Sequence, residues 1–198
     1  MQLSFKPKVL YHPLQSPASL STDPSVMAFS LAKAGSTLLY DILMTLAPKA
    51  GMTFFSAEDA LFQQNVGPHQ RIGNIGSVFS PTGFCYGGFR QFPAYPVPIL
   101  HQCRTIFLVR DPRDMAVSLY FSLLKSHVVP EGDENSGARD SMEKARSTLS
   151  SVSVSEWAIR AATIQYTRMF EGYIAQGFHW RPNVAVFRYE DVIFEKEA

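Results

Sequence analysis

Short apolar runs alternate with helix-like patterns along most of the chain. Val26 to Leu31 (VMAFSL) and Thr105 to Val109 (TIFLV) are short, largely apolar runs, which are typical of buried strands. From Ser36, apolar side chains recur at helical spacing as far as Pro48, which marks the end of that helix. Strands separated by helices pair in parallel through right-handed crossovers. The pattern therefore predicts an α/β fold, a three-layer domain with a central parallel sheet flanked by helices.

The other segments are less regular. The pattern predicts further strands at Met52 to Ser56 and Val184 to Arg188, and helices from Pro112 to about Ser126, around Arg139 to Leu149, and from Ser153 to about Ile174. Polar Val128 to Ala138 is interpreted as a loop. Phe79 to Tyr95, rich in Gly, Pro and aromatic residues, is interpreted as a shaped loop beside a pocket, with a packed pair of strands as the alternative. Residues 1–24 are predicted to be an irregular lead-in, and residues 25–198 a single domain.

Composition excludes several classes of function. The chain has 198 residues and a net charge of +1, which suits one domain without the basic field that nucleic acids or anionic membranes attract. It has no signal-peptide core and no run near the roughly 20 apolar residues of a spanning helix. Cys85 and Cys103 show neither zinc spacing nor a disulfide framework, so we expect two buried thiols in a reducing compartment. These features predict a cytoplasmic protein with no nucleic-acid or membrane partner, and they leave homo-oligomer formation open.

The turn between the first strand and the first helix concentrates anion-binding groups. Gly35 allows a close approach of the backbone to a ligand, and the first amides of the helix have no partner within it. Ser36 and Thr37 add hydroxyl donors, and Lys33 adds a positive charge. The turn therefore predicts a site for a di-anionic group, although an ordinary turn with a capping serine has the same residues. A Walker A loop has its lysine directly after a glycine, whereas Lys33 precedes Gly35.

A second anion-binding pattern is RDPRDMAVS, from Arg110 to Ser118. Asp111 can cap the following helix and Pro112 suits its first position, so Arg110 ends the preceding strand. Ser118 lies about two helical turns further on. Arg110 and Ser118 could bind one phosphate from two sides, although Asp111 and its neighbours could serve as a helix cap alone.

Together these motifs resemble the sulfotransferases that use 3′-phosphoadenosine 5′-phosphosulfate (PAPS). Lys33 to Thr37 (KAGST) is similar to the family's 5′-phosphosulfate loop, Arg110 to Ser118 to its 3′-phosphate motif, and Val186 to Val192 (VFRYEDV) to its Tyr-Glu-Asp segment. The resemblance implies a P-loop NTPase-like architecture. It also implies that the donor is bound by Lys33, Ala34, Gly35, Ser36, Thr37, Arg110 and Ser118.

The resemblance implies a reaction as well. A sulfuryl group would pass from PAPS to a hydroxyl or amine of a small-molecule or carbohydrate acceptor, leaving 3′,5′-adenosine bisphosphate (PAP) as product. Positioning and charge stabilisation do most of the work in such transfers, and no metal is required. Lys33 would act catalytically by stabilising the charge that develops on the departing phosphate.

The general base is the least defined part of this mechanism. Many family members have a histidine in a segment to which Phe89 to Pro93 is the nearest counterpart, and here Gln91 replaces it. Other relatives use a carboxylate after the second strand, which makes Glu58 the first candidate and Asp59 the second. His101 and His127 are further candidates. Arg90 could meet an anionic substrate or form a structural ion pair.

The end of the chain departs from the family pattern. Members usually close the nucleotide site with a Gly-rich basic segment, and none follows the Tyr-Glu-Asp segment before Ala198. The resemblance therefore predicts a C-terminally incomplete domain or a divergent member. Two alternatives to a sulfotransferase stay open: a degenerate, non-catalytic nucleotide-binding module and a P-loop nucleotide kinase.

Overall fold

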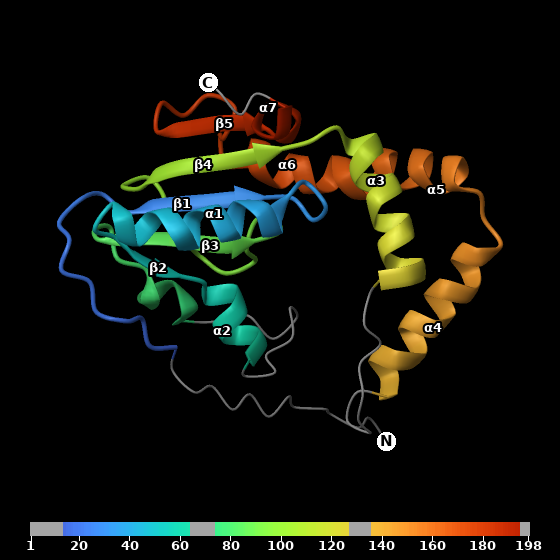
Figure 1. Ribbon diagram of the computed structural model, residues 1–198, viewed down its shortest axis with the longest axis horizontal. Helices are drawn as coiled ribbons and strands as arrows, with labels where there is room; N and C mark the ends of the chain where they lie inside the picture. Colours follow the sequence, from blue (N-terminus) through green and yellow to red (C-terminus); the bar gives the residue numbers. More distant parts are fainter. Residues whose placement is uncertain (1–13, 64–73, 127–135, 195–198) are drawn as a thin grey trace, which may run out of the picture. The chain divides into compact units, whose positions relative to one another are not determined.

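The computed structural model describes residues 14–63, 74–126 and 136–194 (Figure 1). Its centre is a five-stranded parallel sheet in the order β2-β3-β1-β4-β5. The strands are β1 (Val26–Ser30), β2 (Thr53–Phe55), β3 (Phe84–Phe89), β4 (Arg104–Val109) and β5 (Val184–Arg188). The predicted α/β class, with a central parallel sheet flanked by helices, is confirmed.

Helices connect the strands. The α-helices are α1 (Ser36–Lys49), α2 (Ala57–Gln63), α3 (Pro112–Phe121), α4 (Ser136–Ser150), α5 (Val154–Arg160), α6 (Thr167–Ala175) and α7 (Tyr189–Phe194). A 3-10 helix, η2, spans Asn74–Val78, and two π-helical stretches, η3 and η5, span Ser122–Ser126 and Ala161–Tyr166. The long helix predicted after Ser153 is therefore interrupted by a π-helix. The helix predicted after Pro112 ends in one.

Two predicted loops need correction. Phe79 to Tyr95 contains the strand β3, so its interpretation as a loop does not hold for Phe84–Phe89, where the alternative of packed strands does. The loop predicted at Val128 to Ala138 is wrong for its last three residues, because α4 begins at Ser136. The rest of that prediction lies outside the described residues.

The glycines of β3 left its sequence open between a loop and a strand. The strand is almost wholly buried between β2 and β1, so it shows no alternation of apolar and polar residues. Gly88 has a φ of +85°, and a Cβ there would collide with the Ser56 hydroxyl. The pairing with β1 also shifts: Met27 lies opposite Tyr86, but Phe29 lies opposite Phe89. The glycines thus serve a bulge inside a central strand, which in a sequence resembles a loop.

The chain forms two compact units. Unit 1 comprises Met1–Phe29, Thr37–Phe89 and Pro93–Ile106, and unit 2 comprises Ser30–Ser36, Arg90–Phe92 and Phe107–Ala198. In unit 1, Leu43 and Ala47 of α1 pack on Ala28 of β1 and Cys85 of β3. In unit 2, the ring of Tyr173 on α6 stacks on that of Phe107 in β4, with their centroids 4.3 Å apart.

The two cysteines are buried in unit 1, as predicted. Cys85 is 3% exposed and Cys103 is 1% exposed. Burial raises the pKa of each thiol to about 11, because a thiolate would lose its hydration there. Both side chains therefore behave as small hydrophobic groups in the native protein.

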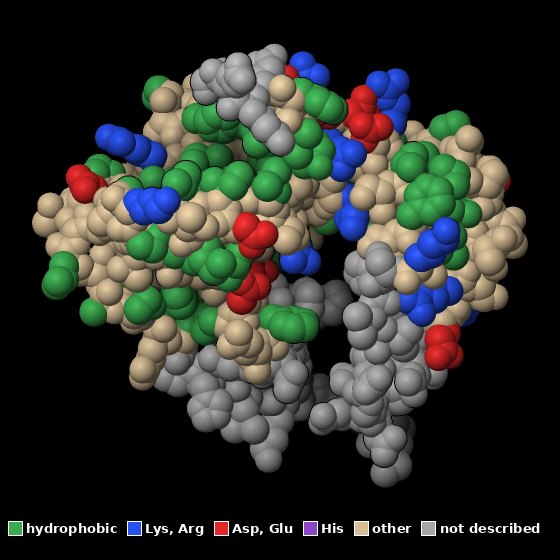
Figure 2. Space-filling model, in the orientation of Figure 1, with side chains coloured by type: hydrophobic (Ala, Val, Ile, Leu, Met, Phe, Trp, Pro, Cys, Tyr) green, Lys and Arg blue, Asp and Glu red, His purple; other side chains and the backbone are tan. Residues whose placement is uncertain are grey.

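The last strand of unit 2 is far more exposed than β3. Val186 and Phe187 in β5 are 52% and 47% exposed, and Phe194 in α7 is 81% exposed. Figure 2 shows hydrophobic side chains at the surface in this part of the molecule. No helix among the described residues has the length and apolar character needed to cross a membrane.

Candidate functional site

Basic residues follow three neighbouring strands at their carboxyl ends. Arg90 comes directly after β3, Lys33 lies three residues after β1, and Arg110 comes directly after β4. These strands are adjacent in the sheet, and all three side chains belong to unit 2. The carboxyl edge of a parallel sheet is where α/β proteins bind ligands. This edge is therefore the candidate site.

The turn from Leu31 to Gly35, here called the β1 turn, has an unusual backbone. Lys33 has a φ of +70°, a left-handed conformation that side chains other than glycine rarely adopt. Gly35 has a φ of +93°. The Ala34 amide donates to the Leu31 carbonyl at 3.0 Å, and the Ala32 amide donates to the Arg90 carbonyl at 2.9 Å. Strain of this kind persists only where neighbouring residues hold it.

Arg110 joins the two predicted motifs. Its Nη1 donates to the Lys33 carbonyl at 3.2 Å, so the guanidinium helps to hold the β1 turn. Its Nη2 lies 3.9 Å from the Asp114 carboxylate. Its Nε is buried and has no hydrogen-bond partner among the described residues. A partly buried guanidinium whose buried Nε has no partner is well suited to an oxyanion ligand.

The Tyr-Glu-Asp segment completes this cluster. The Tyr189 ring lies over the guanidinium of Arg110, with 4.4 Å between the ring centroid and Cζ. A Cβ on Gly35 would lie only 2.5 Å from the same ring. The Glu190 carboxylate accepts from the Asp111 amide at 3.2 Å. Hydrogen bonding to its own amide does most to lower the pKa of Glu190; burial opposes this, and the hydrogen bond from the Asp111 amide lowers the pKa further.

Two buried tyrosines donate hydrogen bonds to the last residue of β1 and to the β1 turn. The Tyr173 hydroxyl donates to the Ser30 carbonyl at 3.0 Å, and the Tyr166 hydroxyl donates to the carbonyls of Ala32 and Met115, each at 3.3 Å. Burial raises the pKa of Tyr166 to about 12. These tyrosines were missed by sequence reasoning, since a buried tyrosine on a helix carries no local signal of its partner.

The positive charges of the site act on one another. Burial lowers the pKa of Lys33, and the charges of Arg90 and then Arg110 lower it further. Like charges brought together in this way are unfavourable unless an anion lies among them. Within the residues described, no group of three or more His, Cys, Asp or Glu side chains could hold a metal ion.

The remaining donor-site candidates lie near the start of α1 and within α3. Ser36 is the first residue of α1, and Ser118 lies within α3, partly buried. Asp111 caps α3 by accepting from the Arg113 amide at 2.8 Å, as predicted. Ser118 follows Asp114 by four residues, so it lies on the face of α3 that Arg110 approaches. Lys33, Ala34, Gly35, Ser36, Arg110 and Ser118 thus all belong to unit 2.

The base candidates are differently placed. Glu58 belongs to unit 1, as does the donor-site candidate Thr37. The Oε1 of Glu58 accepts from the Tyr95 hydroxyl at 2.8 Å, and Asp59 lies in the same first turn of α2. His101 is exposed, and His127 lies outside the described residues. None of these contacts assigns a base.

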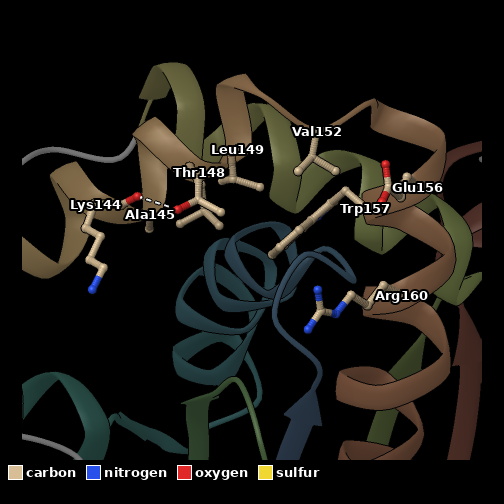
Figure 3. Close-up of a pocket in the computed structure, with 9 residues that line it drawn as sticks. Lys144, Ala145, Thr148, Leu149, Val152, Glu156, Trp157 and Arg160 are labelled. Atoms are coloured by element: carbon tan, nitrogen blue, oxygen red, sulfur yellow. Dashed lines mark hydrogen bonds between the residues drawn. The ribbon is translucent and has the colours of Figure 1, made fainter.

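A separate cavity of about 400 Å³ lies in unit 2 between α4 and α5 (Figure 3). Its walls include Leu149, Val152 and the indole of Trp157. The Trp157 Nε1 is buried without a hydrogen-bond partner in the described part of the chain. No residue predicted from the motifs lines this cavity.

Comparison with known proteins gives a family match that contains the Arg110 to Ser118 and Tyr-Glu-Asp motifs. The family model of the sulfotransferase domain matches residues 92–197, more than half of the chain. No sequence among the curated proteins matches. Among solved structures, mouse sulfotransferase SULT7A1 complexed with PAP is similar, with a TM-score of 0.47 and 19% identity. The match covers 88% of this chain and 53% of that one, so the chain spans about half the length of that protein.

Proposed function

Because the chain belongs to the sulfotransferase family, we propose that it transfers a sulfuryl group from PAPS to a hydroxyl or amine of a small-molecule or carbohydrate acceptor. The observation that carries this proposal is the hydrogen bond from Arg110 Nη1 to the Lys33 carbonyl. It joins the turn that would bind the 5′-phosphosulfate to the motif that would bind the 3′-phosphate.

The donor would be held by groups of the cluster. Arg110 and Ser118 bind the 3′-phosphate, and the Nε of Arg110 supplies a donor that is otherwise unpaired. Ala34, Gly35, Ser36, Thr37 and the first amides of α1 bind the 5′-phosphate, whose charge suits a helix N-terminus. PAP is the product that stays in this site after transfer.

Catalysis would need a cation and a base. The Lys33 ammonium stabilises the negative charge that grows on the phosphate as the bond from sulfur to the bridging oxygen breaks. Glu58 is the proposed base for the acceptor proton. If a Glu58→Gln variant transferred sulfate at the wild-type rate, Glu58 would be excluded as the base.

Calorimetric titration with PAP and with ATP tests the donor site. We expect the wild type to prefer PAP, and Arg110→Ala to weaken PAP binding by about 10- to 100-fold, the range for losing a charged hydrogen-bonding group. Arg113→Ala is the matched control, because this arginine lies in the same motif but pairs with Asp111 at the surface. It should change PAP affinity by less than about two-fold. A preference for ATP, or a folded wild type that ignores PAP, would overturn the proposal.

A further inference from the structure

The cavity between α4 and α5 lies outside every motif that the donor assignment uses. Its apolar wall comprises Leu123 of η3, Ala145 and Leu149 of α4, Val152, and the indole of Trp157 on α5. A volume of about 400 Å³ is within the range of sites that bind small molecules. All the lining residues belong to unit 2, and none is a candidate for binding the nucleotide. The cavity is therefore a second place where a ligand could bind.

Hydrogen bonds from side chains hold the wall of this cavity in place. The Tyr120 hydroxyl, on α3, donates to the carbonyls of Val152 and Leu149, at 2.9 and 3.3 Å. The Nε of Arg146 donates to the Leu123 carbonyl at 2.9 Å. These bonds fix the backbone of η3, of the end of α4 and of the link to α5. A ligand would meet a cavity that is already formed, so its binding would order few groups.

Positively charged side chains lie at the rim of the cavity. Lys144 and Arg160 line it and are exposed, and neither side chain forms a hydrogen bond or ion pair with another described residue. Glu156 precedes Arg160 by four residues but forms no ion pair with it. In Figure 3 the guanidinium of Arg160 extends below the indole of Trp157, whereas the Glu156 carboxylate points upward. Positive charge is therefore left uncompensated beside the apolar wall.

These groups select a class of ligand. The hydroxyl of Thr148, on the cavity wall, already donates to the Lys144 carbonyl at 2.9 Å. A neutral polar ligand would therefore lose hydration against the apolar wall without gaining hydrogen bonds in return. An aromatic anion would bury its ring there, and its charged group would match the planar fork of an arginine.

We propose that this cavity binds a small aromatic anion, a carboxylate or sulfonate, with its ring against Trp157 and its charged group on Arg160. The inference goes beyond the proposed function and does not depend on it, because no residue of the donor assignment lines the cavity.

Two fluorescent probes that differ by one charged group test the role of Arg160. Anilinonaphthalenesulfonate is an aromatic anion, and N-phenylnaphthylamine has the same rings without the sulfonate. In a Trp180→Phe background, Trp157 is the only tryptophan of the chain, so energy transfer from it reports a probe bound nearby. We expect Arg160→Gln to raise the Kd of the anionic probe by about five-fold or more, and to leave that of the neutral probe within about two-fold. Arg168→Gln is the matched control, because Arg168 is an exposed arginine of α6 that does not line the cavity. It should change neither constant.

Filling the cavity tests where the probes bind. Ala145→Phe adds a ring to the wall and should abolish binding of both probes. Thr148→Phe fills the same cavity from an exposed position and replaces Ala145→Phe if that variant does not fold. Far-ultraviolet circular dichroism and the melting temperature of each variant show whether a loss of binding reflects unfolding.

Four results would overturn the inference. The wild type could bind neither probe, a folded filled variant could still bind both, or Arg160→Gln could weaken both probes equally or neither. PAP could also displace the anionic probe, which would place the probe in the nucleotide site. None of these results decides whether PAP itself binds, so the proposed function stands or falls on its own titration.

Discussion

The turns that follow β1 and β2 are built in opposite ways. After β1, backbone carbonyls accept from side chains remote in sequence: Tyr173 to Ser30, Tyr166 to Ala32, and Arg110 to Lys33. After β2, Ser56 caps α2 through the Asp59 amide at 3.2 Å, three residues away. The first turn depends on the folding of unit 2, and the second is largely a local cap. Substitutions far from the β1 turn should therefore change nucleotide binding, and substitutions near the β2 turn should not.

The largest expected effect comes from Gly35→Ala. The new Cβ would lie 2.5 Å from the Tyr189 ring, and φ is +93°. Conformational strain and the clash together should cost about 3 kcal/mol of stability and weaken PAP binding at least ten-fold. Gly51→Ala is the control, with a φ of +71° and nothing within 4 Å of the Cβ position. It should cost only about 1 kcal/mol, without loss of PAP binding. If Gly35→Ala and Gly51→Ala lost equal stability in urea unfolding and equal PAP affinity in calorimetry, the Tyr189 contact would be contradicted.

A smaller effect is expected from removing a hydroxyl behind the turn. Tyr173→Phe leaves the Ser30 carbonyl without this bond, at a cost of about 1–2 kcal/mol. It should also weaken PAP binding by a few-fold, because the turn loses support. Tyr86→Phe removes a similar buried hydroxyl in unit 1, one that accepts from the Ser80 amide at 2.6 Å. That variant should lose similar stability but keep its PAP affinity. If both variants bound PAP equally well, remote support of the β1 turn would not matter for binding.

Lys33 should produce a weaker, pH-dependent signal. Burial, aided by Arg90 and Arg110, holds its pKa below 10.5 in the free protein. Bound PAP favours the charged form and raises the pKa again. Between the two pKa values, binding takes up protons, and affinity falls as pH rises. Calorimetry in two buffers of different ionisation enthalpy measures this uptake. Lys33→Gln should abolish it, and proton release by the wild type would show that the sign is wrong.

The smallest effect is expected from substitutions near the turn that follows β2. Glu58→Gln and Asp59→Asn alter the turn after β2, which lies in unit 1. Both should leave PAP affinity within about two-fold of wild type. A ten-fold change in either variant would mean that this turn contributes to donor binding after all.

The comparison also explains what the sequence could predict. The sequence indicated the β1 turn because Lys33 and Gly35 lie close together just before Ser36, and it predicted β1 and β5 from short, largely apolar runs. The local pattern left β3, whose Gly88 serves a bulge, open between a loop and a strand, and it did not reveal the π-helix that divides the helix predicted after Ser153. It also failed for Tyr166 and Tyr173, whose partners lie more than one hundred residues away. The sequence therefore indicated the residues of the β1 turn, but not the long-range hydrogen bonds that support this turn.

The buried thiols of Cys85 and Cys103 can report on the opening of unit 1. A thiol with a pKa near 11 and almost no exposure reacts with an alkylating reagent only when its surroundings open. The rate of labelling therefore measures how often unit 1 opens, without any engineered probe. Repeated with PAP present, the same measurement asks whether the nucleotide stabilises unit 1, to which Thr37 belongs. Slower alkylation would mean that unit 1 opens less often when the nucleotide is bound.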